Sequence, residues 1–235
     1  MKRKITVFCF LCLFIIQINA QDGNQNVVSS ELNTSGTSYL VKDYPQGVYP
    51  TLDDLLQKKG INMGDAIERK LVFGRKSNAI PKDVVANQVY FYFKRDSVMV
   101  NKYDAISYNG NLYIQQRLIK KLAAKKDKNQ EGNDLNSYHR VINDGKFWYF
   151  EGPYANMWSK AFAYGAGGAV GGAIGSNLGS LKGIVFSLEK KEFNLIRDCE
   201  GLNLIIEEYK GTKIECKDKE VSILVVRENI DKIIK

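Results

Sequence analysis

An uncharged stretch of twenty-one residues between Lys160 and Lys182 constrains this chain more than any other feature of its sequence. It reads AFAYGAGGAVGGAIGSNLGSL. One alanine and four glycines recur in it at a strict four-residue spacing and form what we call the glycine stripe: Ala163, Gly167, Gly171, Gly175 and Gly179. Residues four apart lie on nearly the same face of an α-helix, so the stripe predicts a smooth groove along one side.

Three interpretations of this stretch stay open at the level of sequence. The first is a membrane-embedded helix or helical hairpin, since small-xxx-small faces let helices approach closely in membranes. The second is a helix that packs within its own domain or against a second copy of the chain. The third is a glycine-rich loop, because each interior glycine costs a helix in water about 1 kcal/mol relative to alanine.

A dinucleotide-binding turn is a fourth interpretation, and the sequence argues against it. The run Gly165-Ala166-Gly167-Gly168 follows a short apolar stretch, as the phosphate-binding fingerprint requires. The fingerprint then needs a glycine where Val170 stands, and several further βαβ units where only about fifty residues remain. We therefore predict no cofactor.

The amino terminus has the pattern of a secretory signal peptide. Three basic residues at positions 2–4 precede an apolar run from Ile5 to Ile16 and a small residue, Ala20, after which we expect cleavage. An uncleaved membrane anchor is the alternative, although the apolar run is shorter than the roughly twenty residues of a membrane span. The sequence predicts an exported protein of the periplasm or outer envelope, or a secreted one.

The remaining chain divides by composition into four parts. Residues 21–43 are rich in Asn, Ser, Gly and Gln and predict a flexible linker. Residues 44–152 predict a mainly β domain, and residues 153–182 form what we call the glycine-zipper segment. Residues 183–235 predict a β-hairpin followed by helices, within the same domain as residues 44–152.

The β signals are strands and hairpins with recognisable turns. Residues 88–93 are an aromatic strand, and Asn109-Gly110 predicts a tight turn between strands 105–108 and 112–115. A second hairpin is expected to pair residues 138–142 with 146–150, and a third to pair 183–188 with 192–196. A solvated loop that follows a helix end is expected over residues 120–136.

Helical signals lie at both ends of the folded part. Thr51 is placed to cap a short helix, and apolar residues at helical spacing predict a helix from Cys199 to Lys210. Residues 218–234 predict another helix, with a strand over 221–226 as the alternative. Together these elements predict an α+β fold of antiparallel hairpins with a glycine-rich helical segment and carboxy-terminal helices.

Charge and cysteines limit the partners and the redox chemistry. Removal of the three basic residues of the signal lowers the net charge from +8 to +5, and the lysines form no single block. Nucleic-acid binding is therefore not expected. Cys199 and Cys216 remain after cleavage, either as a disulfide in an oxidising compartment or as two buried thiols.

The residues give little support to an enzyme. After the signal segment, the one histidine, His139, stands between Tyr138 and Arg140 in an expected strand, and no CxxC, HExxH or Gly-x-Ser-x-Gly motif is present. We predict an ordinary strand residue at this position. No catalytic residue and no metal site are predicted.

The opening of the folded part resembles a known family. The motif Tyr44-Pro45-Gln46-Gly47-Val48-Tyr49, the hairpin at Asn109-Gly110, the glycine block and the Cys199-to-Tyr209 helix are similar to an uncharacterised family of exported proteins from Gram-negative bacteria. The resemblance implies an exported accessory protein and transfers no activity.

Two functional hypotheses follow from the sequence. The first is a non-enzymatic envelope protein that associates with a membrane, or with itself as a homo-oligomer, through the glycine stripe. The second is a soluble binding module that stacks a ligand on an aromatic sheet face. Its candidate contacts are Tyr90, Tyr92, Tyr108, Tyr113, Trp148 and Tyr149.

Overall fold

A run of aromatic residues that begins at Phe147 lies at the centre of the fold. Each of Phe147, Trp148, Tyr149 and Phe150 is buried. Strand neighbours point to opposite faces of a sheet, so four consecutive buried residues require cover on both faces. The structure is a computed structural model, and it describes residues 43–73, 76–80, 86–131, 134–156 and 181–235.

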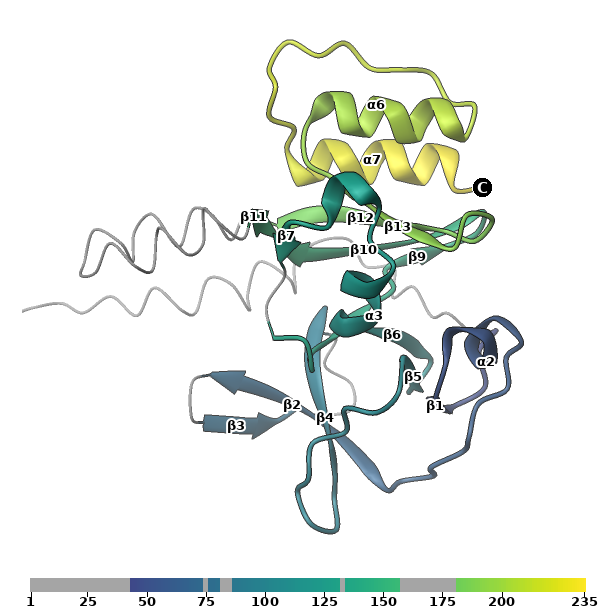
Figure 1. Ribbon diagram of the computed structural model, residues 1–235, viewed down its shortest axis with the longest axis vertical. Coiled ribbons are helices and arrows are strands. Elements are labelled where there is room, and N and C mark those ends of the chain that lie inside the picture. Colours follow the sequence, from purple (N-terminus) through teal and green to yellow (C-terminus); the bar gives the residue numbers. More distant parts are fainter. Residues whose placement is uncertain (1–42, 74–75, 81–85, 132–133, 157–180) are drawn as a thin grey trace, which may run out of the picture. The chain divides into compact units, whose positions relative to one another are not determined.

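The aromatic run belongs to a four-stranded sheet in the order β13-β12-β10-β9 (Figure 1). Strands β10 and β12 pair antiparallel over seven residue pairs, from Phe147 opposite Ser187 to Pro153 opposite Leu181. This ladder is the longest in the described part of the chain. The bounds of the strands are β9 (Asn143–Asp144), β10 (Phe147–Pro153), β12 (Leu181–Ser187) and β13 (Glu192–Ile196).

A second sheet has seven strands in the order β1-β5-β6-β8-β4-β2-β3, and every pairing within it is antiparallel. A separate pair joins β7 (Gln130–Glu131) to β11 (Ala155–Asn156). The strands of the larger sheet are β1 (Gly47–Tyr49), β2 (Ile67–Phe73), β3 (Lys76–Ala79), β4 (Gln88–Phe93), β5 (Ala105–Tyr108), β6 (Asn111–Gln115) and β8 (Tyr138–Arg140).

Helices of the described residues lie beside and between these sheets. The Thr51 hydroxyl caps α2 by accepting a hydrogen bond from the Asp54 amide, and the Asp54 carboxylate accepts one from the Thr51 amide. This reciprocal pair satisfies amide groups that the first helical turn leaves free. The helices are α2 (Leu52–Leu56), α3 (Gln116–Lys121), the 3₁₀ helix η1 (Lys125–Asp127), α6 (Cys199–Glu208) and α7 (Ile223–Ile233).

The two sheets share an aromatic core. Trp148 stacks on Phe186 with ring centroids 4.9 Å apart, and Phe186 lies 4.4 Å from Phe193. Leu112 and Ile114 of β6 belong to the same buried cluster, so this core joins the seven-stranded sheet to the four-stranded one. Apolar burial of this kind supplies most of the free energy that holds two sheets together.

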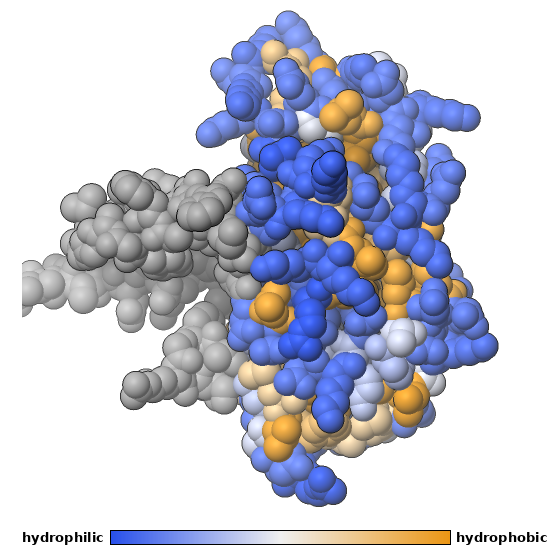
Figure 2. All heavy atoms as spheres, in the orientation of Figure 1, coloured by the Kyte–Doolittle hydropathy of each residue, from blue (hydrophilic) through white to orange (hydrophobic). Residues whose placement is uncertain are grey.

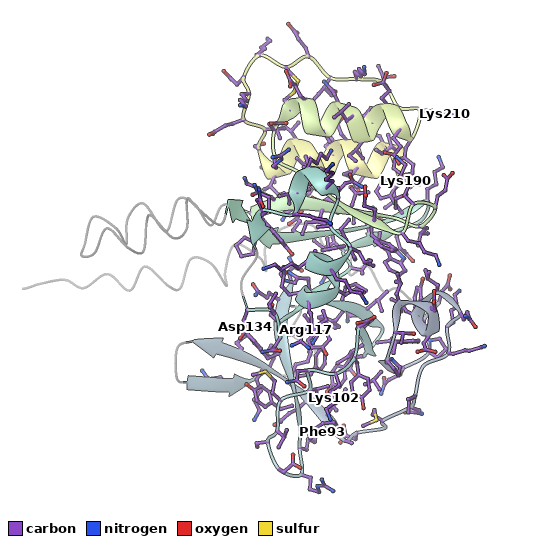
Figure 3. The ribbon with its side chains drawn as sticks, in the orientation of Figure 1. Phe93, Lys102, Arg117, Asp134, Lys190 and Lys210 are labelled. Atoms are coloured by element: carbon purple, nitrogen blue, oxygen red, sulfur yellow. A yellow bond between two sulfur atoms is a disulfide. The ribbon has the colours of Figure 1, made fainter. Side chains whose placement is uncertain are left out.

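The opposite face of the four-stranded sheet is covered by α6 and α7. Phe147 and Tyr149 are buried there with apolar side chains of both helices, including Leu202 and Ile230. The exposed sides of α6 and α7 carry mainly hydrophilic residues in the face that Figure 2 shows. An ion pair of 2.8 Å between Lys190, in the β12–β13 turn, and Glu208 links the hairpin to α6 (Figure 3).

A third buried cluster lies on the other face of the seven-stranded sheet. It contains Phe91, Tyr113 and Tyr138, whose rings meet edge to face around Phe91. The buried Arg69 donates a 2.8 Å hydrogen bond from Nη1 to the Tyr113 hydroxyl. Strands β5, β6 and β8 of the larger sheet are therefore buried on both faces.

The structure confirms the predicted α+β class and much of the local detail. Asn109 and Gly110 have φ angles of 49° and 72°, as a tight hairpin turn between β5 and β6 requires. The third hairpin, the helix from Cys199 and the capped helix after Thr51 are present. Residues 223–233 are helical, so the strand alternative for this part is wrong.

The predicted second hairpin is wrong in its pairing. Tyr138–Arg140 forms β8 of the seven-stranded sheet and pairs with β4 and β6 instead of β10. The chain then crosses to the other sheet, where Asn143–Asp144 makes a short hairpin with Trp148 and Tyr149. The turn residues correctly predicted a chain reversal before β10, but a local pattern does not specify the distant strands with which β8 pairs.

The helix end expected at the start of residues 120–136 is present, since α3 ends at Lys121. The solvated loop expected after it is more ordered than predicted, because it contains the η1 turn and strand β7. Ala124 donates a 2.9 Å backbone hydrogen bond to Phe193, which attaches this segment to the edge strand β13.

We predict that Phe186→Ala lowers the free energy of unfolding by about 3–5 kcal/mol, because it opens a cavity in the core shared by the two sheets. The measurement is urea unfolding followed by tryptophan fluorescence. Leu224→Ala is the control, since Leu224 is 61% exposed and its truncation should change stability by less than about 0.5 kcal/mol. Equal losses in the two variants would contradict the assigned core.

Candidate functional site

The candidate site is the end of the four-stranded sheet that contains Pro153 and Leu181, the sheet residues on either side of the glycine stripe in sequence. Pro153 is the last residue of β10 and lies opposite Leu181, the first residue of β12. Beyond Pro153, Ala155 and Asn156 pair with β7. Pro153 and Leu181 are thus neighbours in one sheet, whereas Asn156, the last described residue before the stretch, lies in the β7–β11 pair (Figure 1).

The glycine stripe itself lies outside the described residues, and so do the predicted cleavage site after Ala20 and most of the predicted linker over residues 21–43. The stripe residues concerned are Ala163, Gly167, Gly171, Gly175 and Gly179. The predicted boundaries of the glycine-zipper segment include residues that belong to strands, since β10 ends at Pro153 and β12 begins at Leu181.

A cavity of about 540 Å³ adjoins the point where the chain returns at Leu181, and we call it the basal cavity. It lies between the ends of β12 and β13 and the start of α7. Gly183 allows the helix to come close, because a Cβ atom there would stand only 2.9 Å from Val226 Cγ1. The lining residues are Leu181, Lys182, Gly183, Ile196, Arg197, Glu220, Val221, Ser222, Ile223 and Val226.

Two basic residues belong to this lining. Gly183 pairs with Ile196, so Lys182 and Arg197 stand next to each other one step further along the two strands. Burial lowers the pKa of the Lys182 ammonium, and the positive charge of Arg197 lowers it further. Arg197 is anchored by its Nε, which lies 3.4 Å from Oδ1 of the buried Asp127.

A buried ion pair lies one strand away from the cavity. Glu151, opposite Gly183 in the ladder, has a fully buried side chain. Its two carboxylate oxygens accept 2.7 Å hydrogen bonds from Nε and Nη2 of Arg227 on α7, and the Tyr149 hydroxyl donates a third bond of 2.8 Å. A bidentate pair of this kind fixes the position of α7 on the sheet.

The aromatic residues of the second hypothesis are mostly unavailable to a ligand. Tyr108, Tyr113, Trp148 and Tyr149 are buried in the three clusters, because the strands that carry them are covered on both faces. Tyr90 and Tyr92 are half-buried on β4. The Lys70 ammonium lies 4.7 Å from the centre of the Tyr92 ring.

His139 occupies a strand, as predicted, but its surroundings are unusual. It is fully buried in β8, and Tyr154 lies beside it with ring centroids 6.1 Å apart. Neither ring nitrogen has a partner with good hydrogen-bond geometry. Burial lowers the pKa of His139 from 6.5 to about 4, and the nearby Glu151 backbone opposes this shift only in part. Such a ring is shielded from substrates.

Cys199 and Cys216 form a disulfide in the structure. It joins Cys199, at the start of α6, to Cys216 in the loop before α7, with Cα atoms 5.8 Å apart. The cross-link closes a loop next to the helical layer that carries Arg227.

Comparisons with known proteins add no assignment: no family model matches the chain, and no curated protein and no solved structure matches it. Among the described residues, no helix is both long and apolar enough to cross a membrane. The same residues contain no group of three or more His, Cys, Asp or Glu side chains that could hold a metal ion.

Sequence reasoning missed the basal cavity and the Glu151–Arg227 pair. A glutamate that follows four aromatic residues in a strand is a signal for a buried carboxylate, and such a group needs a cation. The partner on α7 could not be identified, because 76 residues separate the two in sequence.

We expect Arg227→Met to lower the free energy of unfolding by about 3 kcal/mol or more, because it leaves the Glu151 carboxylate buried without its cation. The measurement is chemical denaturation at neutral pH. The control is Lys232→Met, which removes an exposed pair with Glu228 and should leave stability nearly unchanged. The additional change Glu151→Gln should restore part of the loss, and failure to do so would contradict a buried charge as its cause.

The buried His139 predicts acid sensitivity. Its pKa is lower in the folded chain, so the unfolded chain binds more protons between pH 6.5 and pH 4. The free energy of unfolding is therefore unaffected by His139 above pH 6.5, where the ring is neutral in both states. It declines by roughly 3 kcal/mol as the pH falls toward 4. The free energy of unfolding, compared with that of His139→Phe across this range, should show that decline in the native chain only. Parallel curves would contradict the prediction.

Proposed function

We propose that the protein is an exported, non-enzymatic protein of the cell envelope, which associates with a membrane or with further copies of itself through the glycine stripe. The export part of this proposal rests on the basic and apolar pattern of residues 1–20. The association part rests on the uncharged, regularly spaced small residues between Lys160 and Lys182.

The observation that carries the proposal is the register between Pro153 and Leu181. Opposite residues of antiparallel strands have Cα atoms about 5 Å apart. A helix that crosses a bilayer once needs about twenty residues and separates its ends by about 30 Å. The described strands therefore favour an insertion or a docking in which the chain enters and leaves from the same side.

The charges at the site agree with this geometry. Lys160 and Lys182 flank the uncharged residues, and Arg197 stands beside Lys182 at the end of β13. Basic residues at the edge of an apolar element favour contact with anionic membrane surfaces. The buried aromatic residues give the alternative of a stacking module little support.

The proposal predicts that Gly171→Leu combined with Gly175→Leu abolishes association, because leucine side chains fill the groove. Association is measured as co-sedimentation with membranes after a high-salt wash, and as the oligomer peak in sedimentation velocity. The matched control is Gly168→Leu with Gly172→Leu, which adds the same apolar volume at the same spacing but one residue away from the stripe, and so on another face of a helix.

The control variant should still sediment with membranes or retain the oligomer peak. If the stripe variant behaves like the native chain, the groove is not an interface. Equal loss in both double variants would show that any added bulk disrupts the segment, which also contradicts a groove on one face.

A further inference from the structure

The basal cavity has the composition of a site for an amphipathic anion. Its lining includes four aliphatic side chains, which we call the aliphatic floor: Ile196, Val221, Ile223 and Val226. Its volume of about 540 Å³ lies within the range of small-molecule sites. Aliphatic walls suit hydrocarbon, whereas a sugar or a nucleotide base needs aromatic faces or several polar groups.

The basic residues of the lining give the cavity its polar end. Within the described residues, no carboxylate oxygen lies at ion-pair distance from the Lys182 ammonium. Of the nearby carboxylates, Asp127 accepts from the Leu195 amide at 3.0 Å and pairs with Arg197 at 3.4 Å, and Asp198 caps α6 by accepting from Gly201 at 2.8 Å. The Lys182 ammonium beside an aliphatic cavity leaves a favourable place for an anion, and Arg197, whose charge is met in part by Asp127, adds to it.

The start of α7 is not what makes this site. Ser222 already accepts a hydrogen bond from the Val225 amide at 3.3 Å, so one amide of the first helical turn is occupied. Glu220 is the one carboxylate in the lining and its residue is exposed. An anion is therefore placed by Lys182 and Arg197. The negative charge of the exposed Glu220 disfavours a ligand that carries several negative charges.

We infer that the basal cavity binds a phosphate-bearing amphiphile, the head group and first methylenes of an anionic phospholipid. The phosphate lies beside Lys182 and Arg197, and the methylenes contact the aliphatic floor. This inference rests on the proposed function and specifies it. The cavity adjoins Leu181, where the glycine-zipper segment rejoins the sheet, so a bound lipid would hold the fold next to the membrane surface.

The test is calorimetric titration of the full mature chain with dihexanoyl phosphatidylglycerol below its micelle concentration. We expect Lys182→Gln to weaken binding about tenfold, because a charge-assisted contact to phosphate is lost. Lys182→Arg, which keeps the charge, should retain binding. Lys102→Gln is the matched charge control, since Lys102 is exposed in the loop before β5 and lies away from α6 and α7 (Figure 3).

Two further titrations define the ligand. Dihexanoyl phosphatidylcholine should bind at least about tenfold more weakly, since its head group carries no net charge to meet the two cations. Inorganic phosphate should compete poorly, since it gains nothing from the aliphatic floor. Val221→Phe should also weaken binding, because it reduces the cavity without altering charge. Thermal unfolding of each variant shows that the fold is intact.

Unchanged binding in Lys182→Gln, equal binding of phosphatidylcholine, or full competition by inorganic phosphate would each overturn the inference. The stripe variant Gly171→Leu with Gly175→Leu separates it from the proposed function. That variant should lose membrane sedimentation but keep its affinity for the soluble lipid. Loss of lipid binding in Lys182→Gln with normal behaviour of the stripe variant would support the cavity and reject the stripe.

Discussion

The fold depends on one long antiparallel ladder, in which β10 and β12 bury side chains on both of their faces. Trp148 and Phe186 stack toward the seven-stranded sheet, and Phe147 and Tyr149 pack against α6 and α7. Successive residues of a strand point to opposite faces of the sheet. Strands β10 and β12 therefore need the seven-stranded sheet on one face and the two helices on the other. The same ladder fixes Pro153 opposite Leu181. The same ladder therefore forms the core and fixes the two sheet residues between which the glycine stripe lies in sequence.

The charged groups that this ladder buries explain how a helical layer is held in register. Apolar packing is tolerant of small shifts, but a carboxylate without water requires a partner at a defined position. Glu151 receives two bonds from Arg227 and one from Tyr149, which sets α7 against β10. The start of α7 and Lys182 then both line the basal cavity. A site for an anion at this place would link the rigid part of the chain to the surface on which the proposed association occurs.

Local signals predicted the local structure, and long-range pairing escaped them. The turn at Asn109-Gly110 and the cap at Thr51 follow from backbone preferences that a few residues determine. The placement of β8 between β4 and β6 depends on contacts with strands about 25 and 50 residues earlier in the chain, so no short pattern specifies it. β2 escaped attention because it carries charged residues, one of which, Arg69, is buried against Tyr113. Four of the six aromatic residues predicted as a ligand surface, Tyr108, Tyr113, Trp148 and Tyr149, are core residues, because strands buried on two faces show no alternation of polar and apolar residues.

The most direct test of the account is to remove residues 157–180 and join Asn156 to Leu181 through a short Gly-Ser linker. Since Pro153 and Leu181 are neighbours in the ladder, the shortened chain should fold, with a thermal midpoint close to that of the full chain. It should also lose both membrane sedimentation and the oligomer peak. A shortened chain that fails to fold would contradict the independence of the sheets from this segment. One that folds and still associates would contradict the glycine stripe as the interface.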